Sequence, residues 1–440
     1  MTATDADRLA IDDLRNAWVV LSTEERVLGF GLLSSDQAEE FFLSLPGTDA
    51  AELLAALPAQ DRRRWMRLLA PDDAADLIQG ASEEMRGQLL DLLDESTRRE
   101  VSALLAYAED RAGGLMNPRY ARLRPDMNVD EAIAYLRRQT REHLETIYYA
   151  YVVDPDQRLL GVVSFRELFS SPPGIRVRDA MRTDVVTVDE QMDQEAVSRV
   201  FAEHNLIAIP VVDSARRIKG IVTVDDIVDV VEEEATEDIQ KMGGTQALGA
   251  PYLSLGLVEM VKKRIGWLAV LFIGEMFTAT AMAYFEDEIA RAVVLALFVP
   301  LIISSGGNSG SQASTLVIRA MALDEVRLRD WWRVTRRELM TGLLLGLVLG
   351  TIGFLRVVVW QAVRPVYGVH YLAIAFTVFW SLMGVITFGT LTGSLLPFVL
   401  RRFRIDPASA SAPFVATLVD VTGLVIYFTV ATLLLRGKLL

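Results

Sequence analysis

One carboxylate stands inside an otherwise apolar stretch near the end of the chain. Asp420 lies in residues 412–428, where nearly every neighbour is apolar or carries a hydroxyl group. The stretch is long enough to cross a bilayer. A charge at that depth costs about 3 kcal/mol or more unless it meets water, a cation or a polar partner. Asp420 is therefore a candidate cation ligand in a pore; the alternative is a hydrogen bond to a neighbouring helix.

A second unusual segment interrupts another apolar stretch, at residues 300–315. Five of the seven residues in Gly306-Gly307-Asn308-Ser309-Gly310-Ser311-Gln312 are glycines or amides, which is too polar and glycine-rich for a helix that faces lipid. Its glycines allow either close backbone approach or local unwinding. In an unwound segment, free carbonyls and the side-chain amides would line a wet path. The alternative is a tight helix interface, which needs the glycines but not the amides.

These residues must be held by membrane-spanning elements. Five hydrophobic stretches are each long enough to span a bilayer: 265–285, 290–318, 339–360, 371–399 and 412–435. Loop 319–337 carries six arginines and loop 401–404 three, whereas residues 286–288 are all acidic. The positive-inside rule then predicts a cytoplasmic N-terminal part and a C-terminus outside.

Composition narrows the chemistry. The chain has no cysteine, which excludes disulfides, thiolate metal sites and cysteine catalysis, and its three histidines stand in no metal-ligand motif. Residues 1–250 hold 47 acidic and 27 basic side chains, whereas residues 251–440 hold 11 and 17. An acidic half of this kind repels nucleic acid and attracts cations. The alternative is an acidic surface that serves solubility alone.

Residues 14–110 are predicted to form short amphipathic helices. Pro46, Pro58 and Pro71 break the pattern, and acidic residues follow the breaks, where helix N-termini favour them. Short, similar helical units of this kind predict a stacked superhelix that serves docking or sensing.

Residues 113–235 contain an internal duplication. Gly161-Val-Val-Ser-Phe-Arg-Glu in the first copy corresponds to Gly220-Ile-Val-Thr-Val-Asp-Asp in the second, and both copies alternate strands with helices. The segment resembles a tandem pair of CBS domains over residues 115–232. Such pairs often bind adenine nucleotides, which implies roles for four residues: Ser164, Arg166, Glu167 and Thr223. The alternative is that these side chains cap the following helices.

An acidic helix then connects the soluble part to the first span. Residues 230–242 hold five acidic side chains and end at Gly243-Gly244. Acidic helices of this kind usually only face solvent, but this one stands where a gate would be coupled to a sensor.

Taken together, the chain resembles the MgtE family of magnesium transporters and channels. The resemblance rests on Pro300, on residues 306–312, on residues 416–423 and on the order of domains. It implies a homodimer with a pore site formed by Asp420, Asn308, Ala416, Thr417 and Gly307. Magnesium dehydrates reluctantly, so paired carboxylates would hold it through its water shell, and weak coordination would let it leave.

The resemblance also implies that cytosolic Mg²⁺ closes the channel by bridging acidic surfaces. The implied regulatory acids are Asp72, Asp76, Glu195, Asp226, Asp229, Glu234, Glu237 and Asp238. Three residues depart from the family pattern. Asn205 replaces an acidic residue, Leu206 replaces an aromatic residue that could stack on adenine, and Glu275 adds an acid to the first span.

The predicted fold is multidomain: an all-α superhelical N-terminal domain (1–114), an α/β tandem CBS pair (115–232), a connecting helix (233–262) and a five-helix all-α transmembrane domain (263–440). We expect a Mg²⁺-selective, Mg²⁺-gated channel in a bacterial plasma (inner) membrane, with ATP as a further ligand of the CBS pair. Its expected partners are a second copy, the lipid bilayer and divalent cations, with no nucleic acid. The alternatives are a broader Co²⁺/Mn²⁺ transporter, a membrane protease and an anion channel. A metalloprotease would need a His-Glu-x-x-His helix, which is missing from the sequence, and Asp420 would repel a permeant anion.

Overall fold

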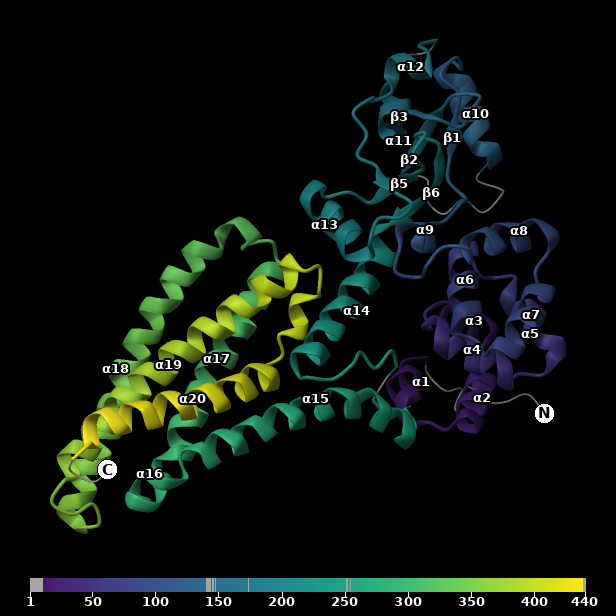
Figure 1. Cartoon of the computed structure of the whole chain (residues 1–440). Helices are drawn as coiled ribbons and strands as arrows, with labels where there is room; N and C mark the ends of the chain where they lie inside the picture. The colour runs from purple at the N-terminus through teal and green to yellow at the C-terminus, as the bar shows by residue number, and fades with distance from the viewer. Residues whose placement is uncertain are drawn as a thin grey trace. The chain divides into compact units, whose positions relative to one another are not determined.

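The computed structural model describes residues 11–139, 144, 146, 148–172, 174–250, 252–253 and 255–437. The chain forms two compact units, residues 1–234 and 235–440. Figure 1 shows the helices and strands of each unit. The predicted fold class is confirmed: a helical N-terminal domain precedes a duplicated α/β pair, and apolar helices follow.

The first unit begins with eight short α-helices. They are α1 (Ile11–Ala17), α2 (Thr23–Leu32), α3 (Ser35–Leu43), α4 (Gly47–Ala56), α5 (Ala59–Met66), α6 (Pro71–Gly80), α7 (Glu83–Leu92) and α8 (Glu95–Leu104), with a 3-10 turn η2 (Trp18–Val20) after α1. Helices two apart in sequence pack on one another, as α2 does on α4, α4 on α6, and α6 on α8. This repeating contact is the stacked superhelix that the regular breaks predict.

Local signals explain where these helices begin. Ser22 and Ser34 each form a capping box with the residue three positions later, Glu25 and Gln37. Pro71 occupies the first turn of α6, where a missing backbone N–H costs nothing. The residue at which α6 begins determines which of its acidic side chains lie on the same face of the helix.

The duplicated segment forms two three-stranded sheets of the same design. The elements are α9 (Ala112–Leu115), β1 (Arg122–Leu123), α10 (Val129–Gln139), β2 (Tyr149–Val153), β3 (Leu159–Ser164), α11 (Phe165–Ser170), α12 (Val177–Ala180), β4 (Val188–Asp189), α13 (Gln194–His204), β5 (Ala208–Val212) and β6 (Ile218–Thr223). The strand orders are β1-β2-β3 and β4-β5-β6, and each sheet has one parallel and one antiparallel pair. Both middle strands carry a register shift at the equivalent place, Val152/Val153 and Val211/Val212. The duplication therefore reaches the level of single hydrogen bonds.

The two copies also exchange backbone contacts. Asn117, which leads into the first copy, donates its N–H to Ile221 O (2.7 Å) and accepts from Ile221 N (2.9 Å). Arg182, which leads into the second, makes the same reciprocal pair with Val162 of the first, at 2.8 and 2.9 Å. Each lead segment thus pairs with the other copy's last strand.

Helix α14 (Val224–Met242) follows β6 and carries the connecting acidic sequence. Helix α15 (Leu257–Tyr284) begins the second unit's spans, followed by α16 (Glu286–Arg291), η4 (Val293–Phe298), α17 (Val299–Ala322), η5 (Leu328–Asp330), α18 (Trp331–Val363), α19 (Tyr371–Arg402), η6 (Pro407–Ser409) and α20 (Ala412–Leu435). Five helical segments in the described residues are long and apolar enough to cross a membrane: Leu257–Tyr284, Val293–Ala322, Leu328–Val363, Tyr371–Arg402 and Ala412–Leu435. The five predicted spans are confirmed.

Small residues bring these spans close together. Four glycines of α18 (Gly342, Gly346, Gly350 and Gly353) are buried against α19. The buried core between α17, α19 and α20 is apolar and includes Ile302, Val385, Val419 and Phe428. Close backbone approach of this kind is how helices associate without a hydrophobic driving force in lipid.

Candidate cation pathway and acidic cluster

Asp420 lies in the third turn of α20, and it is half-buried within this single chain. The helix is capped by Ser411, whose hydroxyl accepts from Phe414 N at 3.4 Å. Ala416 stands one turn before Asp420 on the same face, and Thr417 donates its hydroxyl to Pro413 O at 3.0 Å. A carboxylate on this face is accessible rather than enclosed among the helix's own packing partners.

The face of α20 next to Asp420 makes the packing contacts. Val415, Val419 and Gly423 are buried. A Cβ atom on Gly310 of α17 would lie 2.8 Å from the Val415 side chain, and one on Gly306 would lie 2.8 Å from that of Val419. The glycines are therefore required for close contact between α17 and α20.

The glycine-rich segment does not unwind. Helix α17 is continuous from Val299 to Ala322, so the expected freed carbonyls are absent from it, and the alternative of a tight helix interface describes its glycines. Gly307 lies beside Ala416, since an added Cβ would sit 3.5 Å from the Ala416 Cβ. The glycines of α17 therefore let its backbone pack closely on α20, and its carbonyl groups are not freed as cation ligands.

Helix α17 nevertheless carries a polar face that this chain does not cover. Asn308 is exposed, and so are residues one to two turns away on the same side: Ser304, Gln312 and Thr315. Exposed amides and hydroxyls on a membrane span call for water or a second protein surface, because lipid satisfies none of them.

A second acidic side chain reaches Asp420 from α15. The carboxyl groups of Glu275 and Asp420 lie within hydrogen-bonding distance. Helix α15 approaches closely here, because a Cβ on Gly274 would lie 2.6 Å from the Thr417 side chain. The sequence identifies Glu275 as an unexpected acid of the first span but does not say which neighbour it faces. The structure places it beside Asp420, the candidate pore residue.

The end of α14 contacts the start of α20. Lys241 donates to Asp406 Oδ2 at 2.7 Å and also pairs with Glu237 one turn earlier. Burial opposes the charged form of Lys241, but these two hydrogen bonds outweigh it and raise its pKa. Gly244, with φ of +75°, packs against the Trp267 ring, and Trp267 donates its indole N–H to Ser411 Oγ at 3.0 Å. The connecting helix thus ends at the cap of the helix that carries Asp420.

In the first unit, acidic side chains of α6 and the start of α14 face one another. Burial, together with the nearby charges of Asp73 and Glu109, raises the pKa of Asp76 to about 7. Burial likewise raises the pKa of Asp226 to about 6 against the opposing hydrogen bond from Thr223. The pKa values of Asp73 and Asp229 are also raised, first by burial and then by neighbouring acids. The cluster therefore resists holding all its negative charges at once.

The structure brings together only some of the acids that the resemblance implied. Asp76, Asp226 and Asp229 belong to the cluster, whereas Asp72 is buried and accepts from Asn117 Nδ2 at 3.0 Å. Glu195 instead pairs with Arg199 on its own helix.

The connecting-helix acids lie elsewhere along α14. Glu234 accepts from Gln194 Nε2 at 2.7 Å, Glu237 pairs with Lys241, and Asp238 also has an interaction partner. Sequence reasoning missed Asp73, although its spacing of three from Asp76 puts both on one helix face. Among the described residues, no three acidic or histidine side chains converge on a single inner-shell metal site.

Three of the four residues implied in nucleotide binding, Ser164, Glu167 and Thr223, take part in helix caps here. Ser164 Oγ accepts from Glu167 N at 3.2 Å, and Glu167 accepts from Ser164 N and Oγ at 2.7 and 2.8 Å. Thr223 donates its hydroxyl to Asp226 at 2.7 Å in the second copy. Arg166 is exposed. Asn205 ends α13 with φ of +50°, a left-handed conformation that asparagine tolerates well.

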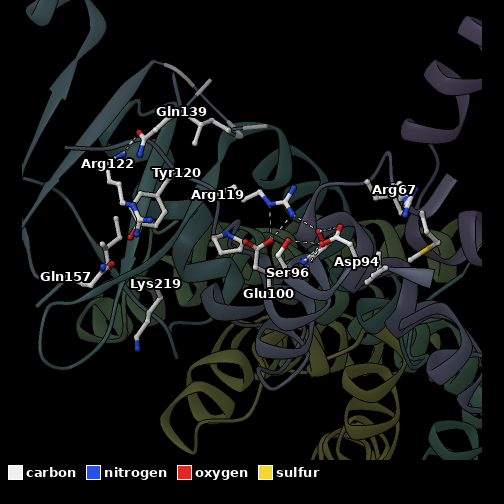
Figure 2. A pocket seen from close by; sticks show the side chains of 17 residues that line it. Arg67, Asp94, Ser96, Glu100, Arg119, Tyr120, Arg122, Gln139, Gln157 and Lys219 are labelled. Carbon is white, nitrogen blue, oxygen red and sulfur yellow. Dashed lines mark hydrogen bonds and ion pairs between the residues drawn. The ribbon is translucent and has the colours of Figure 1, made fainter. Parts of the chain in front are cut away.

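A pocket of about 780 Å³ lies where α8 meets the start of the CBS pair. Figure 2 shows Arg119 in its middle, facing Glu100 and the α8 N-terminus. Arg119 pairs with Glu100 at 2.8 Å and donates to Thr97 Oγ1 at 2.8 Å. Glu100, an acidic residue of this pocket, is thus paired within the protein. The pocket is lined by residues of both the helical domain and the CBS pair, and it is separate from the acidic cluster.

Comparison with known families covers the whole architecture. Residues 299–430 match the MgtE model, a divalent cation transporter; residues 9–110 match the MgtE intracellular N domain; and residues 112–173 and 177–233 each match a CBS domain. A magnesium transporter MgtE of Thermus thermophilus is 43% identical over 433 residues, which are 97% of this chain and 93% of that protein. The chain belongs to the MgtE family. The resemblance predicted from the sequence is confirmed.

Other relatives of this MgtE-family protein are more distant. A magnesium transporter MgtE of Bacillus subtilis is 33% identical over 83% of this chain and 79% of its own length. A solved cytosolic domain of the Mg²⁺ channel MgtE in complex with ATP is 42% identical, with a TM-score of 0.47, over 50% of this chain and 90% of that one. MgtE proteins are transporters rather than enzymes, and the matched transporter region contains Asn308 and Asp420 but not Glu275.

Proposed function

We propose that this MgtE-family chain carries Mg²⁺ across a membrane through a pathway lined by Asp420, Asn308, Ala416, Thr417 and Gly307. The observation that carries the proposal is the pairing of an accessible carboxylate on α20 with an uncovered polar face on the adjacent α17. Neither is compatible with lipid. Both are suited to a hydrated cation, which carboxylates, hydroxyls and amides can bind through its water shell.

The functional form in this proposal is a homodimer. A second copy would cover the polar face of α17 and bring a second Asp420 to the same axis. Two carboxylates can hold a hydrated divalent ion by outer-shell hydrogen bonds, and the ion can still leave because none of its waters has been lost.

The proposed orientation follows the charges of the loops. The arginine-rich loops 319–337 and 401–404 would lie in the cytoplasm with the N-terminal unit, at the inner membrane of a bacterial cell. Five spans then put the C-terminus outside. The proposal keeps the division into residues 1–114, 115–232, 233–262 and 263–440.

Gating by Mg²⁺ is proposed to use the acidic cluster. Asp73, Asp76, Asp226 and Asp229 have raised pKa values, mainly because burial disfavours their charged forms and further because neighbouring acids repel them. A divalent cation among them would relieve that repulsion and hold α6 against the start of α14. The same helix α14 carries Glu234, Glu237, Asp238 and Lys241 further along. Movement of α14 would therefore reach the N-terminal cap of α20 through the contact between Lys241 and Asp406.

ATP at the CBS pair is a further part of the proposal. Arg166 is exposed and could meet a phosphate group. Ser164 and Glu167 would have to exchange their reciprocal cap for ligand contacts. Calorimetric titration of ATP against the whole protein and its Arg166→Ala variant tests this part: heat that persists unchanged in the variant contradicts the assignment.

The central experiment measures divalent flux into proteoliposomes. Wild type should carry Mg²⁺, Asp420→Ala should lose most of the flux, and Asp287→Ala, an acid of α16 outside the spans, should retain it. Raised Mg²⁺ on the side of the N-terminal unit should reduce wild-type flux. Equal flux of Co²⁺ or Mn²⁺ would favour the broader transporter, and undiminished Mg²⁺ flux in Asp420→Ala would refute the pore assignment.

A further inference from the structure

Four arginines line the outer side of the start of α18. Arg329 lies in η5, and Arg333, Arg336 and Arg337 follow within the first two turns of the helix. All four are exposed, and with Trp332, Asp330 and Met340 they line a groove of about 550 Å³. The inner side of α18, marked by Gly342, packs against Thr387 and Thr390 of α19. The groove therefore faces away from the helix bundle of this chain.

Within the described residues, nearby acids neutralise this positive charge only in part: Asp330 pairs with Arg333, and Glu338 interacts with Arg337. One acid, Asp330, lies among the seven groove residues, and it accepts from Arg333 at 3.2 Å and from Arg327 N at 3.2 Å. Arg327 is paired with Asp324. The N-terminus of a helix carries a partial positive charge, so arginines there are disfavoured unless an anion joins them. The four arginines exceed these two acids, and the remaining positive charge favours an anion from outside the chain.

The surface beyond the arginines is apolar and continues on the same helix face. Met340, Leu344 and Leu347 are 57%, 60% and 45% exposed, and they follow Arg333 and Arg336 at helical spacing. Trp332, 62% exposed, stands beside the arginines, and exposed tryptophans near the end of a span are typical of a membrane–water interface. A ligand for this face needs an anionic head and an apolar body.

We propose that this groove binds the headgroup of an anionic phospholipid, with the acyl chains along Met340, Leu344 and Leu347. The phosphate would receive hydrogen bonds from guanidinium groups, which suit phosphate geometry well. A soluble phosphate compound would use the arginines but not the apolar face, so the two sources can be told apart. This inference is independent of whether the chain transports magnesium.

The chain offers a matched control at the end of α19. Arg401 and Arg402 lie in its last turn, where the helix dipole favours cations, and Arg404 follows. These three arginines need no outside anion to offset the dipole and do not line the groove. Replacing them removes the same charge as replacing three groove arginines.

Native mass spectrometry of the full-length protein in detergent, with phosphatidylglycerol or phosphatidylcholine added, tests the proposal. Wild type should retain phosphatidylglycerol preferentially, by about fivefold for each arginine that engages it. Arg329→Gln/Arg333→Gln/Arg336→Gln should lose the preference, and Arg401→Gln/Arg402→Gln/Arg404→Gln should keep it.

Three outcomes would overturn the proposal: the groove variant keeps its preference, both triple variants lose it equally, or inorganic phosphate at millimolar concentration displaces the lipid. The last outcome would identify a soluble-anion site. Thermal unfolding without added lipid checks that the groove variant is folded. If it is not, Arg333→Gln alone, at a side chain that is 85% exposed, should reduce the preference by about fivefold; an unchanged preference would count against the site.

Discussion

The ammonium group of Lys241 donates a 2.7 Å hydrogen bond to the carboxylate of Asp406, and so joins the last turn of α14 to the segment that precedes α20. The two residues are 165 positions apart in sequence. Gly244, Trp267 and Ser411 continue the same contact, and Ser411 caps the helix that carries Asp420. A displacement of α14 would therefore be felt first at the N-terminus of α20.

Breaking this ion pair should change how internal Mg²⁺ controls the flux. Lys241→Met and Asp406→Asn should shift the inhibitory Mg²⁺ concentration in the same direction by about twofold to fivefold, as expected for a partly exposed pair worth ~0.5–1 kcal/mol. The double variant should shift it no further than Lys241→Met alone, because the contact that Asp406→Asn removes is already lost when Lys241 is replaced. Lys262→Met, an exposed lysine of α15, is the control. Additive shifts would show that the two residues act separately.

The acidic cluster should make the stability of the protein depend on pH. The pKa values of Asp76 and Asp226 are raised from 3.8 to about 7 and about 6. A raised carboxyl pKa means that the folded state binds the proton more tightly than the unfolded state. Stability is therefore lost as pH rises from about 4 to 7.

Thermal unfolding of the full-length protein without divalent ions should show this dependence. Wild type should melt at a higher temperature at pH 5.5 than at pH 8, with a difference on the order of 2 kcal/mol from Asp76 alone. Asp76→Asn should melt higher than wild type at pH 8 and depend less on pH, and added Mg²⁺ should reduce the wild-type difference. A melting temperature that falls on acidification would contradict the assignment.

Glu275 should strengthen cation binding at Asp420. The two carboxyl groups lie within hydrogen-bonding distance, so Glu275→Gln removes a negative charge close to the proposed pore site. We expect Mg²⁺ uptake at low external concentration to fall by about threefold to tenfold, with less effect at saturating Mg²⁺. Glu286→Gln, at the start of α16, should leave uptake unchanged. Equal uptake by Glu275→Gln and wild type at every concentration would remove Glu275 from the pathway.

Two glycines of α17 should respond differently to the same substitution. A Cβ on Gly310 would lie 2.8 Å from Gly389 O of α19, so Gly310→Ala forces the helices apart and should cost about 1–3 kcal/mol. A Cβ on Gly307 would meet its nearest atom at 3.5 Å, an ordinary contact, so Gly307→Ala should be tolerated. Unfolding in detergent measures both. Similar losses at the two positions would contradict the packing argument, because the higher helix propensity of alanine would by itself stabilise both variants.

Much of the architecture could be predicted because its signals are local. Long apolar stretches predict the five spans, and the duplicated strand-helix pattern predicts the two sheets. Asp420 could be chosen because a lone carboxylate in such a stretch needs a reason. Capping by Ser164 and Thr223 was also weighed in advance, since a hydroxyl before a helix has that role by default.

The remaining features depend on which side of a helix meets which neighbour. Asp72 and Asp73 are adjacent in sequence, yet Asp72 is buried against Asn117 while Asp73 faces the acids of α14. The proximity of Glu275 to Asp420 requires that α15 pack along α20, which no local pattern encodes. Composition alone suggested that glycines in α17 could unwind it, but close packing against α19 keeps the helix intact.

Helix α15 differs from the other spans in how it is held. None of its residues is buried within this chain, whereas α17, α18 and α19 interlock through glycine contacts. Its close contacts run along α20, from Trp267 beside Ser411 to Gly274 beside Thr417. A helix that packs closely on one neighbour can tilt without disturbing the packing among the other helices of the bundle. Any tilt of α15 would carry Glu275 toward or away from Asp420, so movement of the first span would change the negative charge at the proposed pore residue.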